Sequence, residues 1–138
     1  MKQLAVRDLM SDDVIAVRPE DDLACLHGLM IENDVRHIPV VNTETELVGL
    51  VSHRDLLRAS LIEQPNVTGY MEKAILERVL VHELMTEDVE SVDADADLRD
   101  AAEVMVENKY GCLPVTEGRR LRGILTESDF VRFMARGE

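Results

Sequence analysis

Two segments of the chain carry apolar residues at the spacing of a helix that buries one face. Apolar side chains near one face predict a helix over residues 21–33, and apolar side chains at i, i+3, i+4 and i+7 predict another over residues 96–108. The apolar positions are Leu23, Leu26, Leu29 and Met30 in the first segment and Leu98, Ala101, Ala102 and Met105 in the second. We expect each helix to end in a turn at an asparagine, Asn33 or Asn108.

Short apolar runs bounded by polar turns predict three strands around each helix. They cover residues 14–17, 37–41 and 47–51 in the first half and 89–92, 112–116 and 121–125 in the second. A short helical turn comes first (6–10 or 81–85), and a last helix begins near Ser52 or Thr126. The order β-α-β-β-α in each half gives a fold of the α/β class, in its α+β form. Because two helices cover one face of each small sheet, we expect the halves to pack sheet to sheet.

The two halves are copies of one unit. The 35 residues that begin at Val6 match those that begin at Val81 at 13 positions without a gap, and conservative pairs such as Ser11 with Thr86 add to the match. The following loop is one residue shorter in the second copy, after which GLVSHRDLLR aligns with GILTESDFVR. A match of this length indicates a duplication.

The duplication predicts the domain organisation. We expect one unit over residues 4–62, a linker over 63–79 and a second unit over 80–136. Pro65, Asn66 and Gly69 interrupt the linker near its start, and the apolar pattern of residues 70–81 predicts a helix.

Charge and hydropathy exclude several classes of protein. The 138 residues include 28 acidic and 15 basic side chains, a formal net charge of −13 that repels nucleic-acid phosphates. No run approaches the roughly 20 apolar residues that cross a bilayer, and the first residues lack the apolar core of a signal peptide. We therefore expect a cytoplasmic protein that neither binds nucleic acid nor inserts into a membrane.

The reactive side chains show no catalytic or metal-binding spacing. Cys25 and Cys112 are far apart, and we expect reduced, half-buried thiols. The histidines, which are His27, His37, His53 and His82, lack the spacing of a metal site. No nucleophile–base pair or glycine-rich phosphate loop is evident, since Ser52 and His53 are merely adjacent in sequence. The sequence thus predicts neither an enzyme nor a metal centre.

Three paired motifs carry a resemblance to a known family. They are LMSDDVIAV with LMTEDVESV, RHIPVV with GCLPVT, and GLVSHRDLL with GILTESDFV. Over residues 4–136 the chain resembles the tandem cystathionine-β-synthase (CBS) domain pair, or Bateman module. The resemblance implies two units related by a pseudo-two-fold axis, with clefts between them that hold adenosyl compounds such as AMP, ADP, ATP or S-adenosylmethionine. It also implies a homodimer.

The last motif supplies the sharpest candidate site. Ser52 suits the N-cap of a helix, where free backbone N–H groups attract an anion, and Asp55 lies one turn further on. In the family this aspartate contacts ribose hydroxyls and the Ser or Thr lies near the phosphates, which transfers the roles to Asp55 with Ser52 and to Asp129 with Thr126. The alternative is plain capping of the two helices.

The remaining candidate residues would face the base or set the charge of each site. Because proline removes a donor and keeps its neighbour extended, backbone groups around it could read an adenine edge. The base-side candidates are Val14, His37, Ile38 and Pro39 in the first copy and Val89, Cys112, Leu113 and Pro114 in the second.

The two copies differ in charge next to the aspartate. His53 and Arg54, with Arg36 and Arg58 nearby, favour a phosphate at the first site. At the second site Glu127 disfavours polyphosphate, while Ser128 adds a hydroxyl. Three arginines, Arg119, Arg120 and Arg122, are expected on the preceding loop. We expect the Asp55 site to bind a phosphorylated adenosine better than the Asp129 site.

These observations predict a regulatory module that senses an adenine nucleotide and signals to an unidentified partner protein in trans. No cofactor is expected beyond this regulatory ligand. A structural or dimerisation module with vestigial nucleotide sites is the alternative.

Overall fold

The computed structural model describes residues 3–63, 74 and 76–137. Contacts between Cα atoms group the chain into two compact units. Ile15–Val89 forms one, here called the central unit, and Met1–Val14 together with Glu90–Glu138 forms the other, here called the terminal unit.

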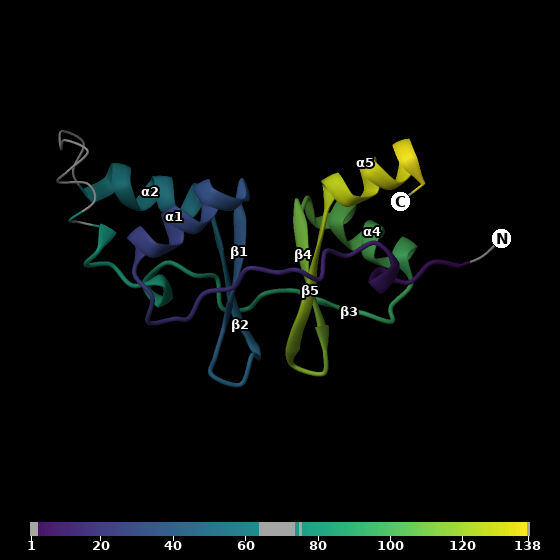
Figure 1. Cartoon of the computed structure of the whole chain (residues 1–138), viewed down its shortest axis with the longest axis horizontal. Coiled ribbons are helices and arrows are strands. Elements are labelled where there is room, and N and C mark those ends of the chain that lie inside the picture. Colours follow the sequence, from purple (N-terminus) through teal and green to yellow (C-terminus); the bar gives the residue numbers. More distant parts are fainter. Residues whose placement is uncertain (1–2, 64–73, 75, 138) are drawn as a thin grey trace. The chain divides into compact units, whose positions relative to one another are not determined.

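The central unit is a β-hairpin with two helices beside it (Figure 1). Its elements are α1 (Leu23–Asn33), β1 (His37–Val41), β2 (Leu47–Ser52), α2 (His53–Glu63) and a 3₁₀ turn at Val81–Glu83. The two strands are antiparallel, with His37 opposite Ser52. The Asp22 side chain accepts a hydrogen bond from the Cys25 N–H and so caps α1.

The terminal unit repeats this plan with one more strand (Figure 1). Its elements are a 3₁₀ turn at Val6–Asp8, β3 (Val92–Asp93), α4 (Leu98–Asn108), β4 (Cys112–Glu117), β5 (Arg120–Thr126) and α5 (Glu127–Arg136). β3 pairs in parallel with β4, and β4 pairs antiparallel with β5. Asp97 caps α4 as Asp22 caps α1.

The predicted helices and hairpin strands are confirmed to within about two residues, but the bounds predicted for the first strand of each copy are wrong. Residues 14–17 make a single bridge, from Val17 to Val40, and the strand expected at 89–92 lies at Val92–Asp93. The proline in each facing strand explains this. Val17 N–H donates to the Pro39 carbonyl, and extension toward residue 15 would require an N–H that Pro39 lacks. Pro114 limits β3 in the same way.

The linker helix predicted over residues 70–81 lies mostly outside the described residues. Ala74 and Leu76 are helical. The prediction is wrong at its end, because residues 77–80 form turns and a bridge from Leu80 to Asp22, and Val81 already belongs to the following 3₁₀ turn.

The start of each repeat packs on the body of the other repeat. We call residues 4–11 the first leader and residues 79–86 the second leader. Val6 is fully buried in the core of the terminal unit, and Val81 is fully buried in the core of the central unit. The compact units therefore do not coincide with the two repeats.

Backbone hydrogen bonds join each leader to the last strand of the unit in which it lies. Ser11 exchanges two bonds of 2.9 and 3.0 Å with Ile124 of β5, and Thr86 exchanges two of 3.0 and 3.1 Å with Leu50 of β2. Glycine makes this approach possible. A Cβ on Gly123 would lie 2.7 Å from the Ser11 carbonyl oxygen, and one on Gly49 would lie 2.6 Å from Met85 Sδ.

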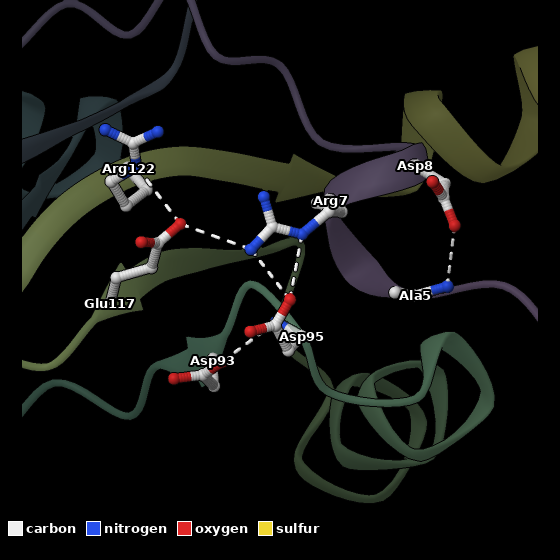
Figure 2. A network of polar contacts seen from close by, with 7 residues as sticks. All are labelled: Ala5, Arg7, Asp8, Asp93, Asp95, Glu117 and Arg122. Atoms are coloured by element: carbon white, nitrogen blue, oxygen red, sulfur yellow. Dashed lines mark hydrogen bonds and ion pairs between the residues drawn. The ribbon is translucent and has the colours of Figure 1, made fainter.

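An exposed ion-pair network adds to the contacts of the first leader (Figure 2). Arg7 Nη2 lies 2.7 Å from Asp95 Oδ1 and 3.3 Å from Glu117 Oε1, and Arg122 Nε also lies 3.3 Å from Glu117 Oε1. Because ion pairs between exposed side chains contribute little to stability, the buried Val6 is the stronger anchor.

Candidate ligand-binding sites

The first candidate site is the junction between β2 and α2. Asp55 Oδ2 accepts hydrogen bonds from both the backbone N–H and the hydroxyl of Ser52, each 2.9 Å long. Ser52 Oγ in turn accepts from the Asp55 N–H at 3.1 Å. This reciprocal cap fixes the carboxylate beside the helix start, where free N–H groups favour an anion. Among the described residues, Asp55 Oδ1 accepts no side-chain hydrogen bond and joins no ion pair.

The second candidate site repeats the cap between β5 and α5. Asp129 Oδ2 accepts from the Thr126 N–H at 2.8 Å and from the Thr126 hydroxyl at 3.1 Å. Here the other oxygen is occupied as well. Asp129 Oδ1 lies 3.1 Å from Arg132 Nη1 and accepts from the Ser11 hydroxyl at 3.5 Å. The Asp129 side chain is only 3% exposed, whereas Asp55 is half-buried.

The base-side candidates on β1 and β4 lie next to these caps and are mostly buried, with Ile38 and Leu113 in the two cores. His37 pairs with Ser52 across the hairpin, as Cys112 pairs with Thr126. The buried members of the set are Ile38, Pro39, Cys112, Leu113 and Pro114. Their side chains are at most 5% exposed, so contact with a ligand would fall to the backbone, as the sequence predicts.

His37 is the titratable member of this set. Burial lowers its pKa below the ordinary 6.5, the negative charge of Asp55 raises it in part, and Arg36 lowers it further. A neutral imidazole beside Asp55 can donate one hydrogen bond and accept another.

Val14 and Val89 are both half-buried, and the structure groups them differently from the sequence. Val14 belongs to the terminal unit, with Asp129, although the sequence associates it with His37. Val89 belongs to the central unit, with Asp55. Each valine follows a leader, and each leader packs on the body of the other repeat. Each valine therefore lies in the same compact unit as the aspartate of the other repeat.

The residues expected to set the charge of each site lie at the helix starts. His53 begins α2, is half-buried and donates its N–H to the Arg36 carbonyl at 2.8 Å. Arg54 and Arg58 are exposed and form no ion pair in the described part of the chain. Glu127 and Ser128 are exposed on α5.

The expectation that three arginines lie on the loop before the second site is wrong. Arg119 lies in the hairpin turn, while Arg120 and Arg122 belong to β5. Arg122 is four residues from Thr126, about 13 Å at roughly 3.3 Å per strand residue. It also pairs with Glu117. These charges therefore belong to the far end of the hairpin.

Sequence reasoning missed two groups at the second site, Ser11 and Arg132. The alignment of Ser11 with Thr86 in the repeated Leu-Met-Ser/Thr motif marks the first. The i, i+3 spacing of Asp129 and Arg132 marks the second. The Leu-Met-Ser/Thr motif and the i, i+3 spacing of Asp and Arg occur in both copies. Neither feature therefore distinguishes the two sites.

The cysteines are free, and Cys25 is exposed rather than half-buried as expected. Among the described residues, no three His, Cys, Asp or Glu side chains cluster as metal ligands. No helix in the described ranges is long and apolar enough to cross a bilayer.

Comparisons with known proteins place the repeat in a family. The family model for the CBS domain matches residues 6–62 and again residues 81–136. An uncharacterized protein of Methanocaldococcus jannaschii is 31% identical over an alignment of 138 positions, which covers 98% of this chain and 33% of that protein. The chain thus spans a third of the length of this curated relative.

Solved structures agree over nearly the whole chain. The Vibrio cholerae protein AcuB is 33% identical, with a TM-score of 0.82 over 97% of this chain and 92% of that one. CBSX2, solved in complex with AMP, is 31% identical, with a TM-score of 0.79 over 96% of each chain. CBS domain pairs are regulatory modules. With both repeats matched, this chain belongs to the CBS domain family.

Proposed function

We propose that this chain is a regulatory module that binds an adenosine nucleotide, AMP, ADP, ATP or a compound like S-adenosylmethionine, between its two CBS units and signals to a partner protein in trans. The observation that carries the proposal is the carboxylate of Asp55. One oxygen is held by Ser52, and the other has no side-chain partner within the described ranges, so it can accept from a ligand.

The chemistry at this junction suits a nucleotide. A carboxylate only accepts hydrogen bonds, so it matches the paired hydroxyls of a ribose. The N–H groups at the start of α2 and the exposed Arg54 favour a phosphate. The complex of CBSX2 with AMP, at 31% identity, supports AMP as the first ligand to test.

Isothermal titration with AMP, and then with ADP, ATP and S-adenosylmethionine, tests the proposal. We expect Asp55→Asn to weaken binding at least about tenfold. The amide oxygen can still accept from the ribose hydroxyls, but it does not carry the full negative charge of the carboxylate. Asp100→Asn, an exposed carboxylate in the first turn of α4, is the matched control and should leave the affinity unchanged. If none of the four ligands binds, or Asp55→Asn binds AMP as tightly as the wild type, the proposal fails.

A homodimer is a second proposal, and an exposed apolar face on α4 and α5 supports it. Val106, Val131 and Met134 are 77%, 68% and 84% exposed, and a hollow of about 470 Å³ lies between the two helices. Exposed apolar patches of this kind mark interaction surfaces. Light scattering of Val131→Glu beside the wild type tests it. We expect the wild type to be a dimer and Val131→Glu to be a monomer. A monomeric wild type would contradict the proposal.

A further inference from the structure

We propose that Arg132 and Ser11 close the Asp129 site to a ribose, so that the chain has one open site and one site occupied by its own side chains. The inference rests on the proposed function, since it concerns which of the two carboxylates can take an adenosine ligand. It assigns a specificity-determining role to two residues outside the shared Ser/Thr-x-x-Asp motif.

The contacts of the Asp129 carboxylate carry the argument. Both oxygens serve partners within the chain, Oδ2 through Thr126 and Oδ1 through Arg132 and Ser11. A ribose donates two hydroxyls to such a carboxylate, so it needs an oxygen that is not already paired. A ligand therefore has to displace the guanidinium before it can bind.

Burial reinforces the closure. The Asp129 side chain is 3% exposed, while the Arg132 side chain that covers it remains 48% exposed. Arg132 also lines a hollow of about 430 Å³ along α5, so the guanidinium that pairs with the carboxylate is itself accessible to solvent. It also neutralises the one negative charge that a ribose hydroxyl would bind.

The first copy has the same residue types without the closure. Arg58 stands three residues after Asp55, as Arg132 stands after Asp129, yet in the described part of the chain it forms no ion pair. Thr86 stands where the other copy has Ser11, and its hydroxyl forms no hydrogen bond to Asp55 among the described residues. The two sites differ in how these side chains lie, rather than in whether they are present.

Displacement of a half-exposed arginine costs a modest amount of binding energy. A charge-assisted hydrogen bond that a ligand must first break lowers its affinity by about tenfold. Over a titration range set for the open site, the wild-type chain should therefore bind one AMP.

Removal of the guanidinium tests the inference. We expect Arg132→Met to bind a second AMP per chain, or to tighten the weaker site by about tenfold, in isothermal titration. Arg132→Lys, which keeps the charge but loses the planar fork, should lie between Arg132→Met and the wild type. Arg99→Met, a change at an exposed arginine of α4 outside both sites, is the control and should leave the stoichiometry unchanged.

A double variant assigns the new binding to its site. In Asp55→Asn with Arg132→Met, one AMP should still bind, and a further Asp129→Asn change should abolish it. Circular dichroism melting of each variant checks the fold, which the exposed position of Arg132 should preserve.

The outcomes separate this inference from the proposed function. Two equal sites in the wild type would overturn the closure while leaving the Asp55 site intact. So would an Arg132→Met variant in which neither the stoichiometry nor the affinity of the weaker site changes. Binding that appears only in Arg132→Met would support the closure and overturn the Asp55 site. No binding to any variant would overturn both.

Discussion

Three effects act on the pKa of the His37 side chain, and they can be separated. Its ring is half-buried beside the end of β2, with Asp55 and Arg36 acting on it in opposite directions. Burial has the largest effect and favours the neutral imidazole, because a charged ring loses its hydration there. The carboxylate of Asp55 offsets only part of this effect.

We expect NMR titration to give His37 a pKa below 6.5. Asp55→Asn should lower the pKa further, and Arg36→Gln should raise it, because each change removes one of the opposing charges. A shift of the same sign in both variants would contradict this account of the site.

The same group makes stability depend on pH. Since the unfolded chain binds a proton at His37 more readily than the folded chain, stability is highest above 6.5 and falls as the pH drops below that value toward the folded pKa. Urea unfolding measured over this interval should show a smaller decline in His37→Gln than in the wild type. Equal declines would show that other groups dominate.

The two thiols should differ in reactivity by position. Cys112 is 5% exposed, and burial raises its pKa to about 12, so almost no thiolate forms at neutral pH. Cys25 is exposed, although desolvation and the charges of Asp21 and Asp22 raise its pKa somewhat. A thiol reagent at pH 8 should modify one cysteine per native chain and two after denaturation. Cys25→Ser should remove the native reaction, and a persistent native reaction would place Cys112 near the surface.

At the scale of elements, the approach of each leader to its strand makes glycine necessary. Gly123→Ala would place a methyl group 2.7 Å from the Ser11 carbonyl oxygen, so the backbone must shift, at a cost of about 2–3 kcal/mol. Gly49→Ala should cost less, about 1 kcal/mol, because the nearest atom belongs to the flexible Met85 side chain. Chemical unfolding of the two variants measures both losses in the free energy of unfolding.

Gly28→Ala is the control for these changes. Gly28 lies inside α1 and a Cβ there would meet nothing within 4 Å, so alanine should stabilise the chain by about 0.5–1 kcal/mol. Equal effects at all three glycines would show that close approach is not what requires them.

The bounds of the helices and strands were easier to predict from the sequence than the contacts between these elements. The apolar spacing of α1 and α4 and the polar turns of the hairpins are local features, so their bounds follow from neighbouring residues. Pairing at Val17 depends instead on the missing N–H of Pro39, which becomes relevant only when the two segments are adjacent. The closure by Arg132 is likewise unpredictable, because Arg58 has the same spacing from its aspartate.

At the scale of the whole molecule, duplication hides which leader belongs to which body. The leaders match at Val6 and Val81, so either pattern would fill either core. Only the fold shows that they are exchanged, with Val6 packed near β4 and β5 and Val81 packed near β1 and β2. Each repeat therefore depends on residues from the other for its core.

This exchange predicts that a substitution in one repeat loosens the other. Val6→Ala leaves a cavity in the terminal unit and should cost about 2 kcal/mol there. Hydrogen exchange by mass spectrometry should then show faster exchange in β4 and β5 and little change in β1 and β2. Val81→Ala is the matched variant and should give the reverse pattern, with faster exchange in β1 and β2. If Val6→Ala instead released the amides of β1 and β2, each leader would pack on its own repeat and the two compact units would have to be redrawn.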